Sequence, residues 1–154
     1  MRAGPVPRML GVFAQHPVLA RSWLTFSGHL RNSTLPDRVR ELATMRTSWL
    51  RRGEYEWAQH VRLSREAGLT DAEIEAIRVG PSAAAWREHD AAVLRAVDEM
   101  ITDRYLSDTT WAELSGWLDR RQLMDLVFTV GTYEILALAF RTFGVELDDD
   151  LKRK

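Results

Sequence analysis

Hydrophobic residues recur every three to four positions along most of the chain, the spacing typical of amphipathic helices. Pro17 and Pro36 stand where helices are expected to start, and Thr70-Asp-Ala-Glu73 has the form of a capping box. No stretch alternates strictly between apolar and polar positions, so a sheet is not predicted. The pattern predicts an all-α fold of about six to eight helices, covering about 9–15, 17–30, 36–52, 54–67, 70–80, 86–101, 107–118 and 120–142.

The chain of 154 residues is long enough to bury one core. No internal repeat or low-complexity linker divides it, so one domain over 1–154 is expected, with its core at about 9–147. In the last two helices, Trp111, Leu114 and Val127 are expected to point inward. The tail 148–154 is charged, and we expect it to fray.

Composition excludes several classes of function. The formal net charge is −1 and the basic residues are scattered, so nucleic acid is not an expected partner. No apolar run reaches the ~18 residues of a transmembrane helix, and the N-terminus has no apolar signal-peptide segment. We therefore expect a cytoplasmic protein with no membrane partner. Cysteine is absent, which removes disulfide and thiolate chemistry.

Glu56 and His60 stand four residues apart, one helical turn from each other, on the apolar side of their helix. Burying a carboxylate and an imidazole has a desolvation cost, so such groups usually have partners and sometimes a chemical role. Spacing alone favours a structural pair. Glu41 lies one helix earlier, and a short connection predicts that the two helices pack as an antiparallel hairpin.

Three segments carry a family resemblance: Arg40-Glu-Leu-Ala-Thr-Met-Arg46, Gly53-Glu-Tyr-Glu-Trp-Ala-Gln-His60 and Ala67-Gly-Leu-Thr-Asp-Ala-Glu-Ile74. They resemble the carboxymuconolactone decarboxylase family, which includes the alkylhydroperoxidase D-like proteins. Later segments, such as 107–114, 123–133 and 143–147, fit as well. The resemblance implies a helical bundle of the alkylhydroperoxidase D-like type over nearly the whole chain.

The peroxidase branch of that family has a Cys-x-x-Cys pair, a histidine four residues after the second cysteine, and an upstream glutamate. The resemblance places Gly53 and Glu56 at the two cysteine positions, and His60 and Glu41 at the acid-base positions. A thiol peroxidase needs one thiolate to attack peroxide and a second thiol to resolve the sulfenic acid. We therefore predict that this chain is not a thiol peroxidase, although the family carries a peroxiredoxin label.

The decarboxylase branch needs no cysteine, metal or organic cofactor, and its substrate is a small lactone acid. By resemblance, His60 is the expected general acid-base group, Glu56 orients it or shares its proton, and Glu41 completes a relay. An acidic substrate also needs a cation, for which Arg46 and Arg51 are candidates and Arg62 is a weaker one. The remaining candidates for the pocket wall are Trp49, Tyr55, Trp57 and Tyr133.

Arg46 lies within an apolar stripe, which is equally consistent with a salt bridge to Glu41 or Glu56 or with a stem snorkelling at an interface. A metal site is the rival interpretation for two glutamates and a histidine. The di-iron pattern, however, uses Glu-x-x-His spacing on two helices, whereas the spacing here is one residue longer and occurs once. We expect neither metal nor cofactor.

The sequence thus predicts a cofactor-independent enzyme that decarboxylates or isomerises a small organic acid or lactone. Family resemblance further implies a homotrimer or homohexamer. A different class stays open: a non-catalytic small-molecule-binding or scaffold protein that retains the fold. A redox role without thiols is disfavoured by the missing cysteines.

Overall fold

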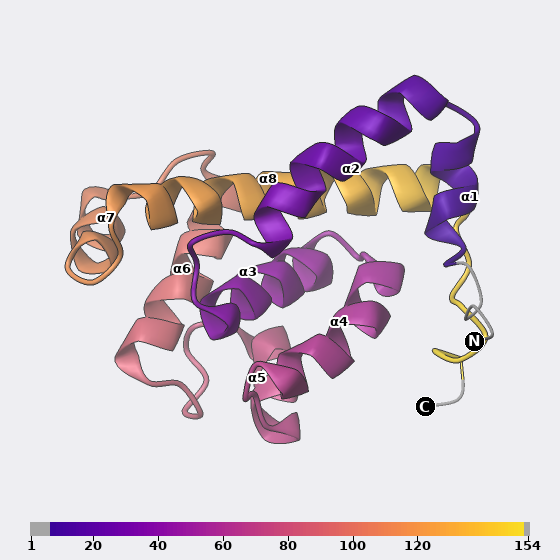
Figure 1. Cartoon of the computed structure of the whole chain (residues 1–154). Coiled ribbons are helices and arrows are strands. Elements are labelled where there is room, and N and C mark those ends of the chain that lie inside the picture. Colours follow the sequence, from indigo (N-terminus) through magenta and orange to yellow (C-terminus); the bar gives the residue numbers. More distant parts are fainter. Residues whose placement is uncertain (1–6, 153–154) are drawn as a thin grey trace.

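The computed structural model describes residues 7–152, which form eight α-helices and no β-strand (Figure 1). The all-α prediction is confirmed. Residues 1–6, where no signal peptide is expected, and residues 153–154 of the charged tail lie outside the described part. The helices are α1 Met9–Ala14, α2 Pro17–Arg31, α3 Asp37–Leu50, α4 Glu54–Glu66, α5 Asp71–Val79, α6 Glu88–Thr102, α7 Asp108–Ser115 and α8 Arg120–Thr142.

Local signals explain most helix boundaries. Thr70 forms the predicted capping box at the start of α5, and the Ser107 side chain caps α7. Three boundaries differ from the prediction by two residues or more, one of them the end of α3 at Leu50. Helix α6 begins at Glu88, because Trp86 lies in the preceding loop, where its indole nitrogen donates to the Gly80 carbonyl at 2.8 Å. Helix α7 ends at Ser115, before Leu118.

Helix α3 is the central element, and it packs against α4, α5, α6 and α8 (Figure 1). Neighbours on every side bury all eight residues from Glu41 to Ser48. A glutamate at the edge of an apolar stripe would reach solvent on a surface helix. On α3 that edge is covered by another helix, and Glu41 is therefore buried.

Helices α2 and α8 run in opposite directions and cross obliquely on one side of the molecule (Figure 1). Phe26 and Phe128 pack edge to face with ring centroids 6.1 Å apart, and further along α2 the His29 ring meets the Asp125 carboxylate at 3.0 Å. Residues later in α2 therefore contact residues earlier in α8, as expected for helices that run in opposite directions.

Helix α8 is apolar on nearly all sides. Its outward face exposes a row of large apolar side chains: Met124, Val127, Phe128, Ile135 and Leu138. The inward predictions for Val127 and Trp111 are wrong, because both side chains are more than 40% exposed, whereas Leu114 is fully buried as predicted. Among the described residues, α8 alone is long and apolar enough to span a membrane, and half of its most apolar window is buried within the fold.

The first residues of the charged tail are held in place, contrary to the expectation that they fray. The Asp148 carboxylate accepts hydrogen bonds from the Arg8 backbone N–H at 2.8 Å and the Tyr55 hydroxyl at 2.7 Å. The Arg8 guanidinium also pairs with Glu146 and Asp149. These contacts join the two ends of the described chain beside α4.

Candidate acid-base site

A cavity of about 640 Å³ lies between α2, α3, α4 and α8, and α1 bounds one end of it. Its size is in the range of small-molecule sites. The exposed side chains of Leu24 and Arg31 line it on α2, so the cavity reaches solvent along that helix. Five of the predicted site residues line this cavity together: Glu41, Tyr55, Glu56, His60 and Tyr133.

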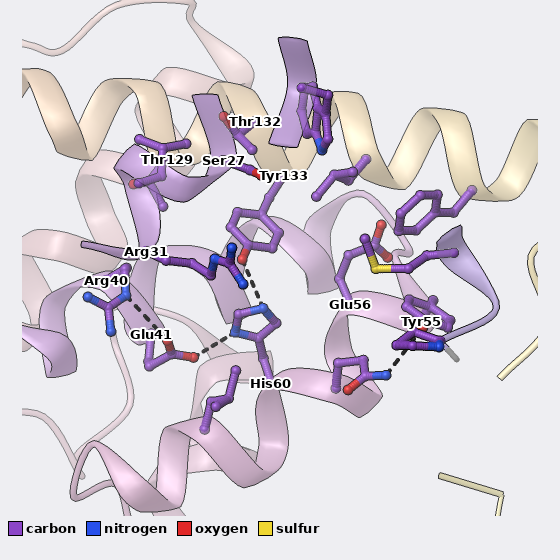
Figure 2. A pocket seen from close by; sticks show the side chains of 18 of the residues that line it. Ser27, Arg31, Arg40, Glu41, Tyr55, Glu56, His60, Thr129, Thr132 and Tyr133 are labelled. Atoms are coloured by element: carbon purple, nitrogen blue, oxygen red, sulfur yellow. Dashed lines mark hydrogen bonds and ion pairs between the residues drawn. The ribbon is translucent and has the colours of Figure 1, made fainter. Parts of the chain in front are cut away.

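Three of these residues form a continuous hydrogen-bonded line (Figure 2). The His60 Nδ1 atom lies 2.7 Å from Glu41 Oε2, and the His60 Nε2 atom lies 2.8 Å from the Tyr133 hydroxyl oxygen. Helix α3 supplies the carboxylate, α4 the imidazole and α8 the phenol. The predicted α3–α4 hairpin thus brings Glu41 and His60 into contact.

Burial and charge determine the protonation pattern of this line. Glu41 is 3% exposed and the His60 side chain 14%. All partners are satisfied when His60 Nδ1–H donates to Glu41 and His60 Nε2 accepts from the Tyr133 O–H. Burial and the nearby Glu41 charge raise the pKa of Tyr133, so its phenol keeps the proton at neutral pH.

Glu56 occupies a different environment from the one predicted for it. It makes no hydrogen bond to His60; Glu41 orients the imidazole instead. Glu56 is 3% exposed, and neither carboxyl oxygen has a hydrogen-bond partner among residues 7–152. Burial raises the pKa of this carboxyl group, which favours the protonated form. The cavity wall therefore holds a buried carboxyl group with a raised pKa as well as the Glu41–His60–Tyr133 line.

Gly53 makes room for the Glu56 carboxyl. A methyl group on Gly53 would lie 2.6 Å from Glu56 Oε2 and 3.2 Å from the Ala137 methyl. Gly53 has a φ of −79°, which any residue adopts, so the backbone does not require glycine here. We therefore assign the need for a glycine at this position to the Glu56 side chain.

Substituting Gly53→Ala is expected to displace the Glu56 carboxyl and to destabilise the fold by about 1 kcal/mol through overpacking. Thermal unfolding followed by circular dichroism measures this effect. Gly28→Ala is the matched control, because a methyl group there meets nothing within 4 Å. Equal melting temperatures for the two variants would contradict the proposed packing role.

Tyr55 lines the cavity, but its hydroxyl is already engaged. It donates to Asp148 and lies 3.2 Å from the Gln59 side-chain nitrogen. Burial and the Asp148 contact raise the pKa of Tyr55 to about 12. Tyr55 therefore offers its ring to the cavity, while its hydroxyl anchors the tail.

Arg46 does not line this cavity, so it is not a substrate-binding group there. Its guanidinium donates to both Asp98 carboxylate oxygens, at 2.6 and 2.9 Å, and to the Ile77 carbonyl at 2.7 Å. A salt bridge was one of the expected alternatives, but its partner is Asp98 and not Glu41 or Glu56. Gly80, with a φ of +100°, leaves space for this guanidinium. Arg46 thus ties α3 to α6 and to the end of α5.

Trp49 and Trp57 also lie outside the cavity. Their rings contact each other with centroids 5.7 Å apart, and the Arg78 guanidinium lies 4.8 Å from each centroid. The other two cation candidates are paired as well, Arg51 with Glu134 and Arg62 with Glu66. None of these four residues lines the cavity that holds His60.

Sequence reasoning missed two arginines that do line the cavity, Arg31 and Arg40. Arg40 adjoins Glu41 in the family motif, so its position could have been inferred from the motif. Its guanidinium bonds Asp37 at 2.8 Å and lies 3.6 Å from Glu41. Arg31 is the last residue of α2, where the sequence pattern breaks, and no motif includes it.

No cluster of three or more potential metal ligands occurs in the described part of the chain. His60 is instead held by one carboxylate and one phenol. The arrangement of Glu41, His60 and Tyr133 suits proton transfer, in which a histidine is oriented through one nitrogen and exchanges a proton through the other.

Comparison with known proteins identifies the family. The family model of the carboxymuconolactone decarboxylase family matches residues 17–99, which include Glu41, Glu56 and His60. The chain belongs to this family. A search of curated proteins returned no match.

Solved structures share the fold at low sequence identity. A protein of unknown function from Agrobacterium tumefaciens has a TM-score of 0.78 and 17% identity, covering 88% of this chain and 94% of its own. The alkylhydroperoxidase AhpD core of a peroxidase-related protein from Ralstonia eutropha JMP134 has a TM-score of 0.84 and 16% identity, covering 97% and 80%. A cysteine-to-alanine variant of the debrominase Bmp8, bound to 2,3,4-tribromopyrrole, has a TM-score of 0.77 and 11% identity, covering 91% and 76%.

Proposed function

We propose that this protein is a cofactor-independent acid-base enzyme that decarboxylates or isomerises a small organic acid or lactone. The observation that carries the proposal is that two separate proton-carrying groups line one cavity. One is the line from Glu41 through His60 to Tyr133, and the other is the buried Glu56 carboxyl, whose pKa is raised by burial. Both reactions need a proton placed on, or taken from, a substrate carbon.

Each group has a distinct part in this chemistry. Glu41 holds His60 in one orientation and stabilises the charged imidazolium that forms when His60 gains a proton. We place Tyr133 at the reacting end of the line. Its O–H passes a proton to His60 Nε2 as the hydroxyl oxygen takes one from the substrate, and the imidazolium formed can later return a proton to the product through Tyr133. Glu56, buried and with a raised pKa that favours its protonated form, is the second donor. Decarboxylation needs one donor for the carbanion left by carbon dioxide, whereas isomerisation uses both groups.

The absence of cysteine limits the alternatives within the family. With no thiol in the chain, neither peroxide attack nor resolution of a sulfenic acid has a side chain to perform it. The alkylhydroperoxidase and debrominase neighbours therefore support the fold of this protein, and their activities are not transferred to it.

A library of small carboxylic acids and lactones tests the proposal. Turnover is followed by carbon dioxide release and by absorbance changes, with a chelator present and with a peroxide-plus-dithiol arm included. At least one acid or lactone should turn over, each hit should be lost in His60→Ala, and the peroxide arm should be silent. Peroxide turnover that survives the chelator, or hits that persist in His60→Ala, would contradict the proposal.

A second candidate is a non-catalytic small-molecule-binding protein. The observation in its favour is that both nitrogens of His60 already have hydrogen-bond partners, as in a structural histidine. In that case ligands would bind in the cavity without turnover. Assembly as a homotrimer or homohexamer stays a prediction, and the exposed apolar row on α8 supports it.

A further inference from the structure

We infer that Arg31 binds the carboxylate of an elongated, apolar-bodied acid whose body extends from Arg31 to the aromatic end of the cavity. This inference rests on the proposed function, because it names the substrate class of the same site. It adds a recognition residue that lies outside the motif segments, and it specifies how the ligand is oriented in the cavity.

The charge of Arg31 has no partner in the described structure. Among residues 7–152 its side chain makes no ion pair or hydrogen bond, although it lines the cavity. Figure 2 shows its guanidinium pointing into the cavity toward the His60–Tyr133 pair. The charge of Arg40 is already offset by Asp37 and Glu41. Of the two arginines in the cavity wall, Arg31 is therefore the one available to a ligand anion.

The opposite end of the cavity is apolar. Phe13 stacks on Trp23 with ring centroids 5.8 Å apart and meets the edge of Phe140 at 6.2 Å. Phe140 packs on Tyr55 at 5.4 Å. Of these four, Trp23, Tyr55 and Phe140 line the cavity. They form a wall suited to an aliphatic or aromatic body.

Helix geometry gives the distance between the two ends. Trp23 and Arg31 stand eight residues apart on α2, roughly 12 Å at 1.5 Å per residue. Tyr133 and Phe140 stand seven residues apart on the oppositely directed α8, roughly 10 Å. A ligand anchored at Arg31 therefore runs past Tyr133 along the cavity, and its far end lies against Trp23 and Phe140.

Calorimetric titration with butanoate, hexanoate and octanoate, each paired with its neutral primary amide, tests this orientation. Affinity should rise roughly threefold per added methylene, and each acid should bind about tenfold more tightly than its amide. Arg31→Gln should remove the preference for the acid and leave amide binding unchanged, while Arg31→Lys should restore part of it. Arg21→Gln, on the same helix but outside the cavity, is the matched control.

The outcomes separate this inference from the proposed function. Equal affinity for acid and amide in the wild type, or an acid preference that survives Arg31→Gln, would overturn the role of Arg31. If His60-dependent turnover is then found with a neutral substrate, the proposed enzymatic function is retained and only the role of Arg31 is rejected. An acid preference that depends on Arg31, with no turnover of any acid, would support the recognition site and favour the non-catalytic candidate.

Discussion

Replacing His60 by alanine is expected to lower kcat by about 10²–10⁴-fold for any substrate that the wild type turns over. The physical reason is that His60 is the only group joining Glu41 to Tyr133 in the described structure: its two nitrogens bond them at 2.7 and 2.8 Å. Without the imidazole, Tyr133 has no base to exchange its proton with. Steady-state kinetics with the first hit from the acid and lactone library measures the effect.

His89→Ala is the matched control, because His89 stacks on Trp117 with ring centroids 4.3 Å apart and does not line the cavity. Tyr133→Phe then locates the reacting end of the line. If the phenol exchanges the proton with substrate, this variant should lose about as much kcat as His60→Ala. An unchanged kcat in Tyr133→Phe would show that His60 Nε2, and not the phenol, exchanges the proton with the substrate. An unchanged kcat in His60→Ala would contradict the proposed proton relay.

The fold follows from the sequence where local chemistry sets it. The Thr70 capping box, Pro17 and the apolar spacing of the last helix predict α5, α2 and α8 to within a residue or two. What failed is the inward or outward direction of single side chains. The periodicity of α8 says little about direction, since both of its faces are apolar, and Val127 accordingly lies outside.

The candidate site, like the fold, was predictable from the sequence only in part. The α3–α4 hairpin brings Glu41, Glu56 and His60 to one cavity, because the spacing within a helix hairpin fixes which side chains meet, and Tyr133 joins them from α8. The partner of each group depended on tertiary packing. Glu41 bonds His60 across the α3–α4 hairpin, whereas the spacing along α4 alone had paired His60 with Glu56. Arg31 enters from α2, a helix separate from the α3–α4 hairpin, so no local pattern could assign it to the site.

Glu56→Gln is expected to raise stability at alkaline pH while lowering activity. Burial raises the pKa of Glu56 in the folded protein above its unfolded value of 4.5. Between the two pKa values the folded state binds more protons than the unfolded state, so the free energy of unfolding falls as pH rises through that window. Above the folded pKa, wild type is destabilised by about 1.4 kcal/mol for each unit by which the pKa is raised. Glutamine keeps the shape of the side chain and never ionises.

Melting temperatures of wild type and Glu56→Gln, measured between pH 4 and pH 9, test this expectation. The curves should coincide at the acid end and diverge as pH rises, by about 2–4 °C for each kcal/mol. Glu54→Gln, exposed in the same helical turn, should follow wild type. If Glu56 is the second proton donor, kcat should also fall by about 10²-fold in Glu56→Gln. Parallel melting curves would show that the pKa of Glu56 is the same in the folded and unfolded states, which would contradict its raised pKa. Diverging curves with unchanged kcat would show a buried Glu56 that takes no part in the reaction.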